Sequence, residues 1–193
     1  MNTRIDHRII SGIIEPGSSV LDLGCGNGDL LELLTKEKNV RAQGIEIDEQ
    51  AIYQCVAKGL SVFHGDIDSG LSEYADRSFD YVILNQSLQQ VRHVESVLKD
   101  ALRVGKKVII GLPNFAYCKA RFQLFFGGRV PVTPSLPYSW YDTPNLHFLS
   151  LSDFLYYCRE RGIKIEKAVY TQGKKRSGLF PNFFAELGIF VIK

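Results

Sequence analysis

Three closely spaced glycines, with an acidic residue on either side, form the part of the sequence best suited to bind a ligand. The glycines are Gly24, Gly26 and Gly28, and the acids are Asp22 and Asp29. A glycine lacks a Cβ, so the backbone can turn sharply and a ligand can lie directly against it. The order G-x-G-x-G differs from the G-x-G-x-x-G of dinucleotide sites, where a pyrophosphate lies on a helix N-terminus. A tight strand-to-helix turn without a ligand is the alternative interpretation.

The charges around this turn favour a cationic ligand over a pyrophosphate. A carboxylate repels a phosphate charge by about 1 kcal/mol at about 4 Å in water, and by several times more near protein. An ammonium and a sulfonium would be attracted instead, and S-adenosylmethionine (SAM) carries both. We therefore predict that SAM, or S-adenosylhomocysteine, binds at this turn. The predicted contacts here are Asp22, Gly24, Cys25, Gly26 and Gly28.

Acidic residues further along the chain support the same ligand. Glu46 ends a second predicted strand, where a carboxylate can accept hydrogen bonds from both ribose hydroxyls, and Ile47 would lie on one face of the adenine. Asp66 follows a third predicted strand and is placed to accept from the adenine amino group, with Ile67 beside it. Taken singly, Glu46 is also explained as a solvated strand-end charge and Asp66 as part of an ordinary turn.

The elements that would position these residues alternate between strand and helix. Strands are predicted near residues 20–23, 41–48, 60–64, 81–84, 107–111, 164–171 and 188–192. Helices are predicted near residues 5–14, 30–36, 49–58, 94–102 and 152–161, the last opened by an N-cap at Ser150 with acidic Asp153 at N3. This alternation predicts an α/β fold, with a mostly parallel sheet and helices on both faces.

The connection at about residues 112–149 is far longer than the 2 to 6 residues usual in such folds. It is rich in proline and aromatic residues, too apolar for a solvated linker. We expect a helix near residues 116–126, followed by a segment that folds back as a lid or a partner surface. Ligands in open α/β sheets sit at the carboxyl ends of the strands, and this connection leaves from that edge.

The residues that would carry out methyl transfer are less clearly indicated. Transfer to oxygen or nitrogen needs an acceptor lone pair and often a general base, and positioning supplies much of the rate. The candidates for catalytic residues are His147, Asp142 and Tyr141, although local caps and turns would explain the same side chains. Asn114 and Asn145 are further candidates to line an acceptor pocket.

The end of the fourth predicted strand separates this chain from some methylating enzymes. Asn85 and Gln86, predicted as cofactor contacts, are followed by Ser87 and not by the Pro-Pro-aromatic turn that holds a planar amino group in DNA or glutamine methyltransferases. Such substrates are therefore disfavoured. RNA is disfavoured too, because the basic cluster at residues 174–176 stands alone, without interleaved aromatic residues.

Several of these motifs together resemble the class I SAM-dependent methyltransferases. They are Asp22–Gly28, Gly44–Glu46, Gly65–Asp66 and Phe79–Leu84. Further motifs resemble the family of the methionine biosynthesis protein MetW: Asn85–Gln89, Gly111–Phe115, Gly128–Thr133, Leu136–His147 and Asn182–Glu186. The resemblance covers essentially the whole chain. It departs at Leu187 and Gly188, where the family pattern has Gln-Ala.

The resemblance carries expectations about fold and function. It implies one SAM-binding domain over residues 1–193, with a Rossmann-like, seven-stranded, mostly parallel sheet whose last strand lies antiparallel beside the fifth. It implies a role in methionine biosynthesis alongside homoserine O-acyltransferase, without supplying a methyl acceptor. Two functions stay open: a pathway protein whose SAM site senses the end product, and an active small-molecule methyltransferase with its acceptor under residues 112–149.

Composition sets broad limits. The chain has 193 residues, 45% of them hydrophobic, and a net charge of +2, too balanced to argue for nucleic acid or acidic lipid. Its four cysteines form no C-x-x-C pair, so reduced thiols and no metal site are expected. The sequence shows no apolar run of membrane-helix length and no signal peptide at its start. We expect a cytoplasmic protein.

Overall fold

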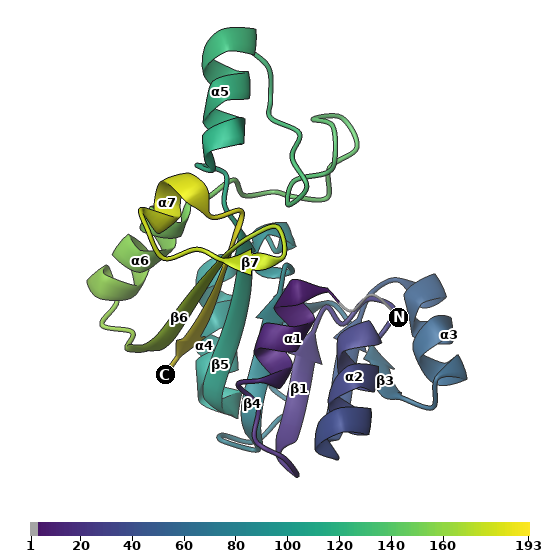
Figure 1. Ribbon diagram of the computed structural model, residues 1–193. Helices are drawn as coiled ribbons and strands as arrows, with labels where there is room; N and C mark the ends of the chain where they lie inside the picture. The colour runs from purple at the N-terminus through teal and green to yellow at the C-terminus, as the bar shows by residue number, and fades with distance from the viewer. Residues whose placement is uncertain (1–3) are drawn as a thin grey trace.

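A twisted eight-stranded sheet organises the computed structural model, which describes residues 4–193 (Figure 1). The strands are β1 (Ser19–Leu23), β2 (Arg41–Glu46), β3 (Ser61–His64), β4 (Phe79–Asn85), β5 (Gly105–Pro113), β6 (Ile165–Gln172), β7 (Lys175–Arg176) and β8 (Leu187–Ile192). Their order in the sheet is β3-β2-β1-β4-β5-β8-β6-β7. Strands β1 to β5 run parallel, and β8 lies antiparallel between β5 and β6.

The predicted α/β fold is confirmed, including the antiparallel last strand beside β5. The expected count of seven strands is one too low. The additional strand is β7, which pairs antiparallel with the end of β6 at the sheet edge. Its two residues, Lys175 and Arg176, are both exposed, so no apolar alternation marks them as a strand.

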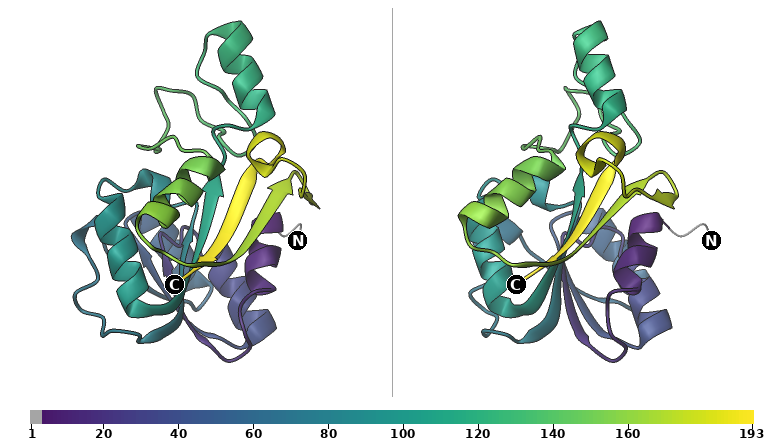
Figure 2. Two further views of the ribbon diagram at one scale, coloured as in Figure 1. Left: turned by 90° about the vertical axis from the view of Figure 1, so that its left-hand side faces the viewer. Right: turned by 60° about the vertical axis from the view of Figure 1, so that its left-hand side comes forward.

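Helices cover both faces of the sheet (Figure 2). They are α1 (Ile5–Ser11), α2 (Asp29–Lys38), α3 (Glu49–Ala57), α4 (Val94–Val104), α5 (Cys118–Gly127), α6 (Leu151–Glu160) and α7 (Pro181–Phe184), with short 3₁₀ turns at Ile67–Ser69 (η1) and Leu88–Gln90 (η2). Apolar residues of α1 and α2 pack on one face, and those of α4 and α6 on the other. The predicted cap of α6 is confirmed, because Ser150 and Asp153 form a complete capping box.

The core lies along the central strands. Residues Tyr81–Leu84 of β4 and Val108–Leu112 of β5 are buried, as expected for strands covered on both faces. The parallel register of β1 and β2 places Asp22 opposite Gly44. Glu46, two residues further along β2, therefore reaches the carboxyl edge of the sheet beside the glycine turn.

Residues 114–150 connect β5 to α6 and rise above the carboxyl edge of the sheet (Figure 1). The helix predicted near residues 116–126 is present as α5, and residues 128–149 follow an irregular path. Asn114 anchors the base of this insertion. It is fully buried, donates to the carbonyls of Asn182 and Ala185, and accepts from the N–H of Ala116. Asn114 therefore has a structural position and does not line an acceptor pocket.

The irregular part of the insertion is fixed at two further points. The side-chain amide of Gln123 on α5 pairs with both the N–H and the carbonyl of Val132. The N–H groups of Leu146 and His147 both donate to the carbonyl of Gln89 in η2, at 2.9 and 3.0 Å. Through residues 4–193, no helix has the length and apolar character needed to cross a membrane.

Candidate functional site

The glycine turn follows β1 at the carboxyl edge of the sheet. Gly24, Gly26 and Gly28 have φ values of 77°, 54° and 76°, a region that other residues adopt only with strain. A Cβ at Gly24 would lie 2.8 Å from the Cβ of Ser87, and one at Gly28 would lie 2.6 Å from Cδ1 of Leu60. A Cβ at Gly26 would meet nothing within 4 Å. The outer glycines thus permit close packing, whereas Gly26 faces open space.

Glu46 is held against this turn by backbone groups. One carboxylate oxygen accepts from the N–H of Gly26 at 2.7 Å, and the other accepts from the N–H groups of Ile47 and Asp48 at 2.8 and 3.0 Å. These bonds fix a carboxylate at the end of β2 before any ligand arrives. The side chain of Ile47 beside it is 60% exposed and presents an apolar surface at the same edge.

Asp22 lies buried behind the turn, with only 2% of its surface exposed. Its Oδ1 has no hydrogen-bond partner among residues 4–193. Burial, and secondly the negative charge of Glu46, raise the pKa of Asp22 to about 7. An unpartnered buried carboxylate is costly and is typical of functional sites. It would be stabilised by a cation.

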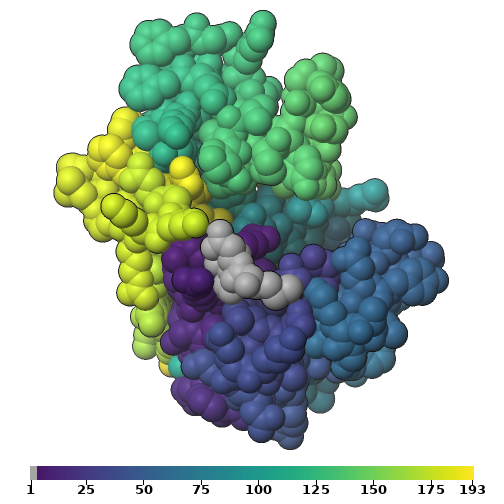
Figure 3. All heavy atoms as spheres, turned by 45° about the vertical axis from the view of Figure 1, so that its right-hand side comes forward, coloured from purple at the N-terminus to yellow at the C-terminus, as the bar shows by residue number. Residues whose placement is uncertain are grey.

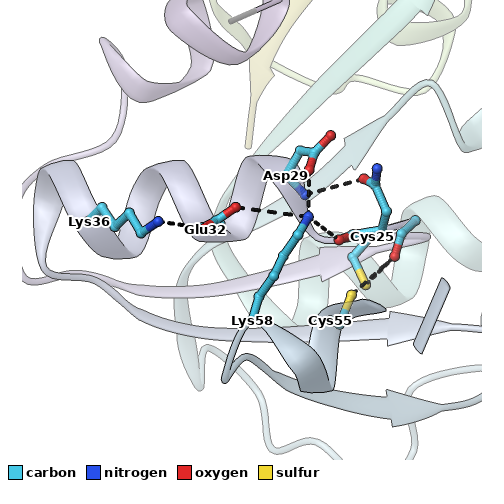
Figure 4. A network of polar contacts seen from close by, with 8 residues as sticks. Cys25, Asp29, Glu32, Lys36, Cys55 and Lys58 are labelled. Carbon is cyan, nitrogen blue, oxygen red and sulfur yellow. Dashed lines mark hydrogen bonds and ion pairs between the residues drawn. The ribbon is translucent and has the colours of Figure 1, made fainter. Parts of the chain in front are cut away.

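The second acid of the motif, Asp29, has a different role from the one expected. Lys58, the C-cap residue of α3, donates to the Asp29 carboxylate at 2.5 Å and to the carbonyl of Asn27 at 2.7 Å (Figure 4). The ammonium neutralises Asp29 and ties α3 to the start of α2. The prediction that Asp29 attracts the ligand is weakened by this ion pair. The negative charge at the turn comes from Asp22 and Glu46.

Two thiols support the turn from beneath. The Sγ atoms of Cys25 and Cys55 lie 3.8 and 3.2 Å from the carbonyl oxygen of Gly26 (Figure 4). Both side chains are buried, and burial raises the pKa of each thiol. These cysteines are neutral packing groups that help to shape the turn.

The end of β3 carries the next predicted contacts. Asp66 is exposed, and its carboxylate accepts from the N–H of Asp68, which caps the turn η1. Ile67 is partly buried against the main apolar core. The two residues therefore fix the loop after β3.

The end of β4 is joined to the first helix through Asp6, a residue that the sequence analysis missed. Asp6 on α1 is 2% exposed and accepts from the side-chain amides of Asn85 and Gln86, both at 3.0 Å, and from Arg4 at 2.6 Å. Burial opposes its ionisation, but the hydrogen bond from Asn85 and the charge of Arg4 outweigh burial and lower the pKa of Asp6. The sequence did hold a signal for this contact, because Asp6 is an acidic residue within a helix that is otherwise identified by its isoleucines.

A cleft of about 600 Å³ opens between the turn, α1 and the insertion. Figure 3 shows this side of the molecule, where the green insertion overhangs the purple N-terminal helix. Gly26, Asn85 and Gln86 line the cleft from the strand ends, and Tyr138 and Asn145 line it from the insertion. Predicted cofactor contacts and part of the insertion therefore share one cleft.

The candidates for catalytic residues do not line this cleft. Tyr141 and Asp142 are exposed on the insertion, and the Tyr141 ring packs edge-on against Trp140. The Nε2 atom of His147 lies 2.9 Å from the carbonyl oxygen of Val91. A carbonyl only accepts, so that nitrogen carries a proton and is not free to act as a base. His147 instead borders a hollow between α4 and α6.

The fold is shared with solved methyltransferase structures. It matches a SAM-dependent methyltransferase from Archaeoglobus fulgidus with a TM-score of 0.68 and 17% identity, over 97% of this chain and 94% of that one. A SAM-dependent methyltransferase from Thiobacillus denitrificans, solved with S-adenosylhomocysteine, matches with a TM-score of 0.59 and 19% identity, over 88% of this chain and 68% of that one. The chain thus has the Rossmann-like fold of these methyltransferases.

The chain belongs to the family of the methionine biosynthesis protein MetW, whose family model matches residues 4–192. A bifunctional methionine biosynthesis protein MetXA/MetW from Rhodopirellula baltica is 36% identical over 175 residues. That alignment covers 86% of this chain and 28% of the relative. The chain therefore spans less than a third of the length of this curated relative.

Proposed function

We propose that residues 1–193 form one SAM-binding, methyltransferase-like domain that acts in methionine biosynthesis, in the cytoplasm and alongside homoserine O-acyltransferase. One arrangement carries the proposal. Backbone N–H groups hold the Glu46 carboxylate beside Gly26, where a Cβ would meet nothing within 4 Å, and the buried Asp22 behind it has a carboxylate oxygen without a hydrogen-bond partner. Membership of the MetW family supports the pathway, and the fused MetXA/MetW relative supports the partnership.

Each strand end would hold a different part of SAM. Glu46 would accept from the ribose hydroxyls, Ile47 would lie on the adenine, and Asp66 would accept from the adenine amino group. Asp22 would attract the cationic methionine end. When bound, SAM supplies an electrophilic methyl group.

The cleft has room for a second small molecule, which supports an active small-molecule methyltransferase as the alternative function. Its acidic side chains are those of Asp6 and Glu186. Asp6 accepts four side-chain hydrogen bonds and has a lowered pKa, and Glu186 accepts from the N–H of Gly173. Asp6 is therefore poorly suited to take a proton from an acceptor, which favours sensing of SAM over catalysis.

Three measurements on the wild-type protein test the proposal. Calorimetry should show binding of SAM, and a pull-down should show a complex with the acyltransferase of the same organism. Incubation with methyl-labelled SAM and a metabolite extract should leave the extract unlabelled. A labelled small molecule would select the alternative function, and the absence of both SAM binding and the complex would contradict the proposal.

A further inference from the structure

Helix α5 leaves an apolar surface without a partner. Every residue from Arg121 to Val130 is exposed, and Phe125 and Phe126 are 82% and 75% exposed. The helix projects above the sheet, and only its lower end comes near α7 (Figures 1 and 2). A helix with large apolar residues on all sides is normally buried. Its exposure here indicates that another molecule covers it.

The aromatic rings of α5 already form an ordered cluster. Phe122 stacks on Phe126 with a centroid separation of 5.9 Å, and Phe125 meets Phe126 edge-on at 4.8 Å. The Arg121 guanidinium lies 5.5 Å from the ring centroid of Phe183 in α7, which braces the helix against its neighbour. Rings that already pack against one another can bind a partner with less loss of side-chain entropy than separate side chains would.

This cluster is separate from the cleft beside the glycine turn. Pro134, Tyr138 and Asn145 of the insertion line that cleft, and none of the residues of α5 does. The insertion therefore has two parts with different surroundings. Pro134, Ser135, Pro137, Tyr138 and Asn145 line the small-molecule cleft, whereas residues 121–130 are exposed to solvent.

The charges around the cluster indicate what kind of surface it would bind. From residue 118 to residue 141 the chain contains Lys119, Arg121 and Arg129 and neither aspartate nor glutamate. An apolar cluster with a wholly basic border is complementary to an apolar groove bordered by carboxylates.

We propose that α5 inserts its phenylalanine cluster into an apolar, acid-rimmed groove on the acyltransferase. The inference rests on the proposed function, because that function supplies the partner. The fused relative, which combines MetXA and MetW parts in one protein, favours a protein partner over a lipid surface. The docking surface thus lies apart from the turn that would bind SAM, so the two can be altered separately.

Calorimetry with the full-length acyltransferase tests the docking surface. The double variant Phe125→Ala/Phe126→Ala should weaken the complex at least about 30-fold, the effect of losing an interface hot spot. Tyr156→Ala, a truncation of an exposed aromatic residue on α6, is the matched control and should leave the complex unchanged. SAM affinity should be unchanged in both variants, which shows that the fold is intact.

Charge reversal supplies a second measurement. Arg129→Glu should slow association and reduce its dependence on salt, because an exposed charge steers the encounter. Lys38→Glu, at the end of α2 on another face, should do neither.

A complex that forms normally with the double phenylalanine variant would overturn this inference and leave the proposed function standing. A wild-type protein that binds SAM but not the acyltransferase would refute the partnership, and the docking inference with it. Two other results would replace the acyltransferase as the partner, provided that the phenylalanine cluster contributes nothing to the acyltransferase complex. One is binding of the cluster to phosphatidylglycerol vesicles. The other is a wild-type dimer that the double variant dissociates.

Discussion

The glycine turn at residues 24–28 and the insertion at residues 112–149 rise from the same edge of the sheet, but they differ in what they leave exposed. At the turn, backbone N–H groups satisfy Glu46, and one small open face remains at Gly26. In the insertion, hydrogen bonds fix the path of the chain, but Phe125 and Trp140 remain 82% and 73% exposed. The turn leaves a face of the size of one backbone position, which suits a small ligand, whereas the insertion leaves whole aromatic side chains exposed, which suits the proposed docking of another macromolecule.

The largest expected effect on the turn comes from Asp22→Asn. The pKa of Asp22 is raised from 3.8 to about 7 in the folded protein. Between these two pH values the folded state binds a proton that the unfolded state lacks, so the stability of the wild type falls as pH rises from about 4 to about 7. Three pKa units correspond to about 4 kcal/mol. The asparagine variant should therefore be more stable than the wild type above pH 7, by up to that amount.

Urea unfolding of both proteins at several pH values between 4 and 8 measures this difference. The same substitution at Asp29, whose pKa is lowered chiefly by its hydrogen bond from Lys58, should destabilise the protein above pH 4 and serves as the control of opposite sign. Equal pH dependence in the wild type and the Asp22 variant would show that Asp22 is ionised and satisfied in the folded protein. SAM should also bind the Asp22→Asn variant more weakly.

Much of the turn could be predicted from the sequence because its geometry is local. The glycines of residues 24–28 follow directly after an apolar strand, and Glu46 ends the strand paired with it. Asp6 was missed because the spacing of isoleucines defines the helix but says nothing of its contact with Asn85. That contact joins residues far apart in the chain.

The path of the insertion could not be predicted for the same reason. It depends on the bonds from Asn114 to Ala185 and Asn182, and on the two N–H groups that share the carbonyl of Gln89. No local pattern encodes these partners. The helix α5 was predicted, but its exposure follows from the path of the chain around it.

Valine substitutions at one glycine of the turn and one of the insertion compare the two regions, because the two glycines have nearly the same φ. Gly26 and Gly128 have φ values of 54° and 58°, and a Cβ at either would meet nothing within 4 Å. Valine should cost about 1–2 kcal/mol of stability at both positions, from left-handed strain alone. Gly26→Val should also lower SAM affinity by at least about 100-fold, because its side chain would fill the cleft, whereas Gly128→Val should bind normally. Calorimetry measures the SAM affinity, and thermal unfolding measures the stability. If the two variants bound SAM with similar affinity, the turn would have only a structural role.

The smallest expected effect concerns Trp140. Its side chain is 73% exposed, so Trp140→Ala should change the free energy of unfolding by no more than about 0.5 kcal/mol. A buried tryptophan would cost about 3–5 kcal/mol. The melting temperature of the variant distinguishes the two cases, and a sharp fall would place this part of the insertion in the core. SAM affinity should not change.

The central claim is that SAM binds at the turn through Glu46. Hydrogen bonds to a charged acceptor contribute about 1.5–3 kcal/mol, so Glu46→Gln should weaken SAM binding about 10- to 100-fold in calorimetry. Glu73→Gln, the same change at an exposed loop position, is the control and should bind as the wild type does. A Glu46→Gln protein with wild-type affinity, or a wild-type protein that binds no SAM, would contradict the account.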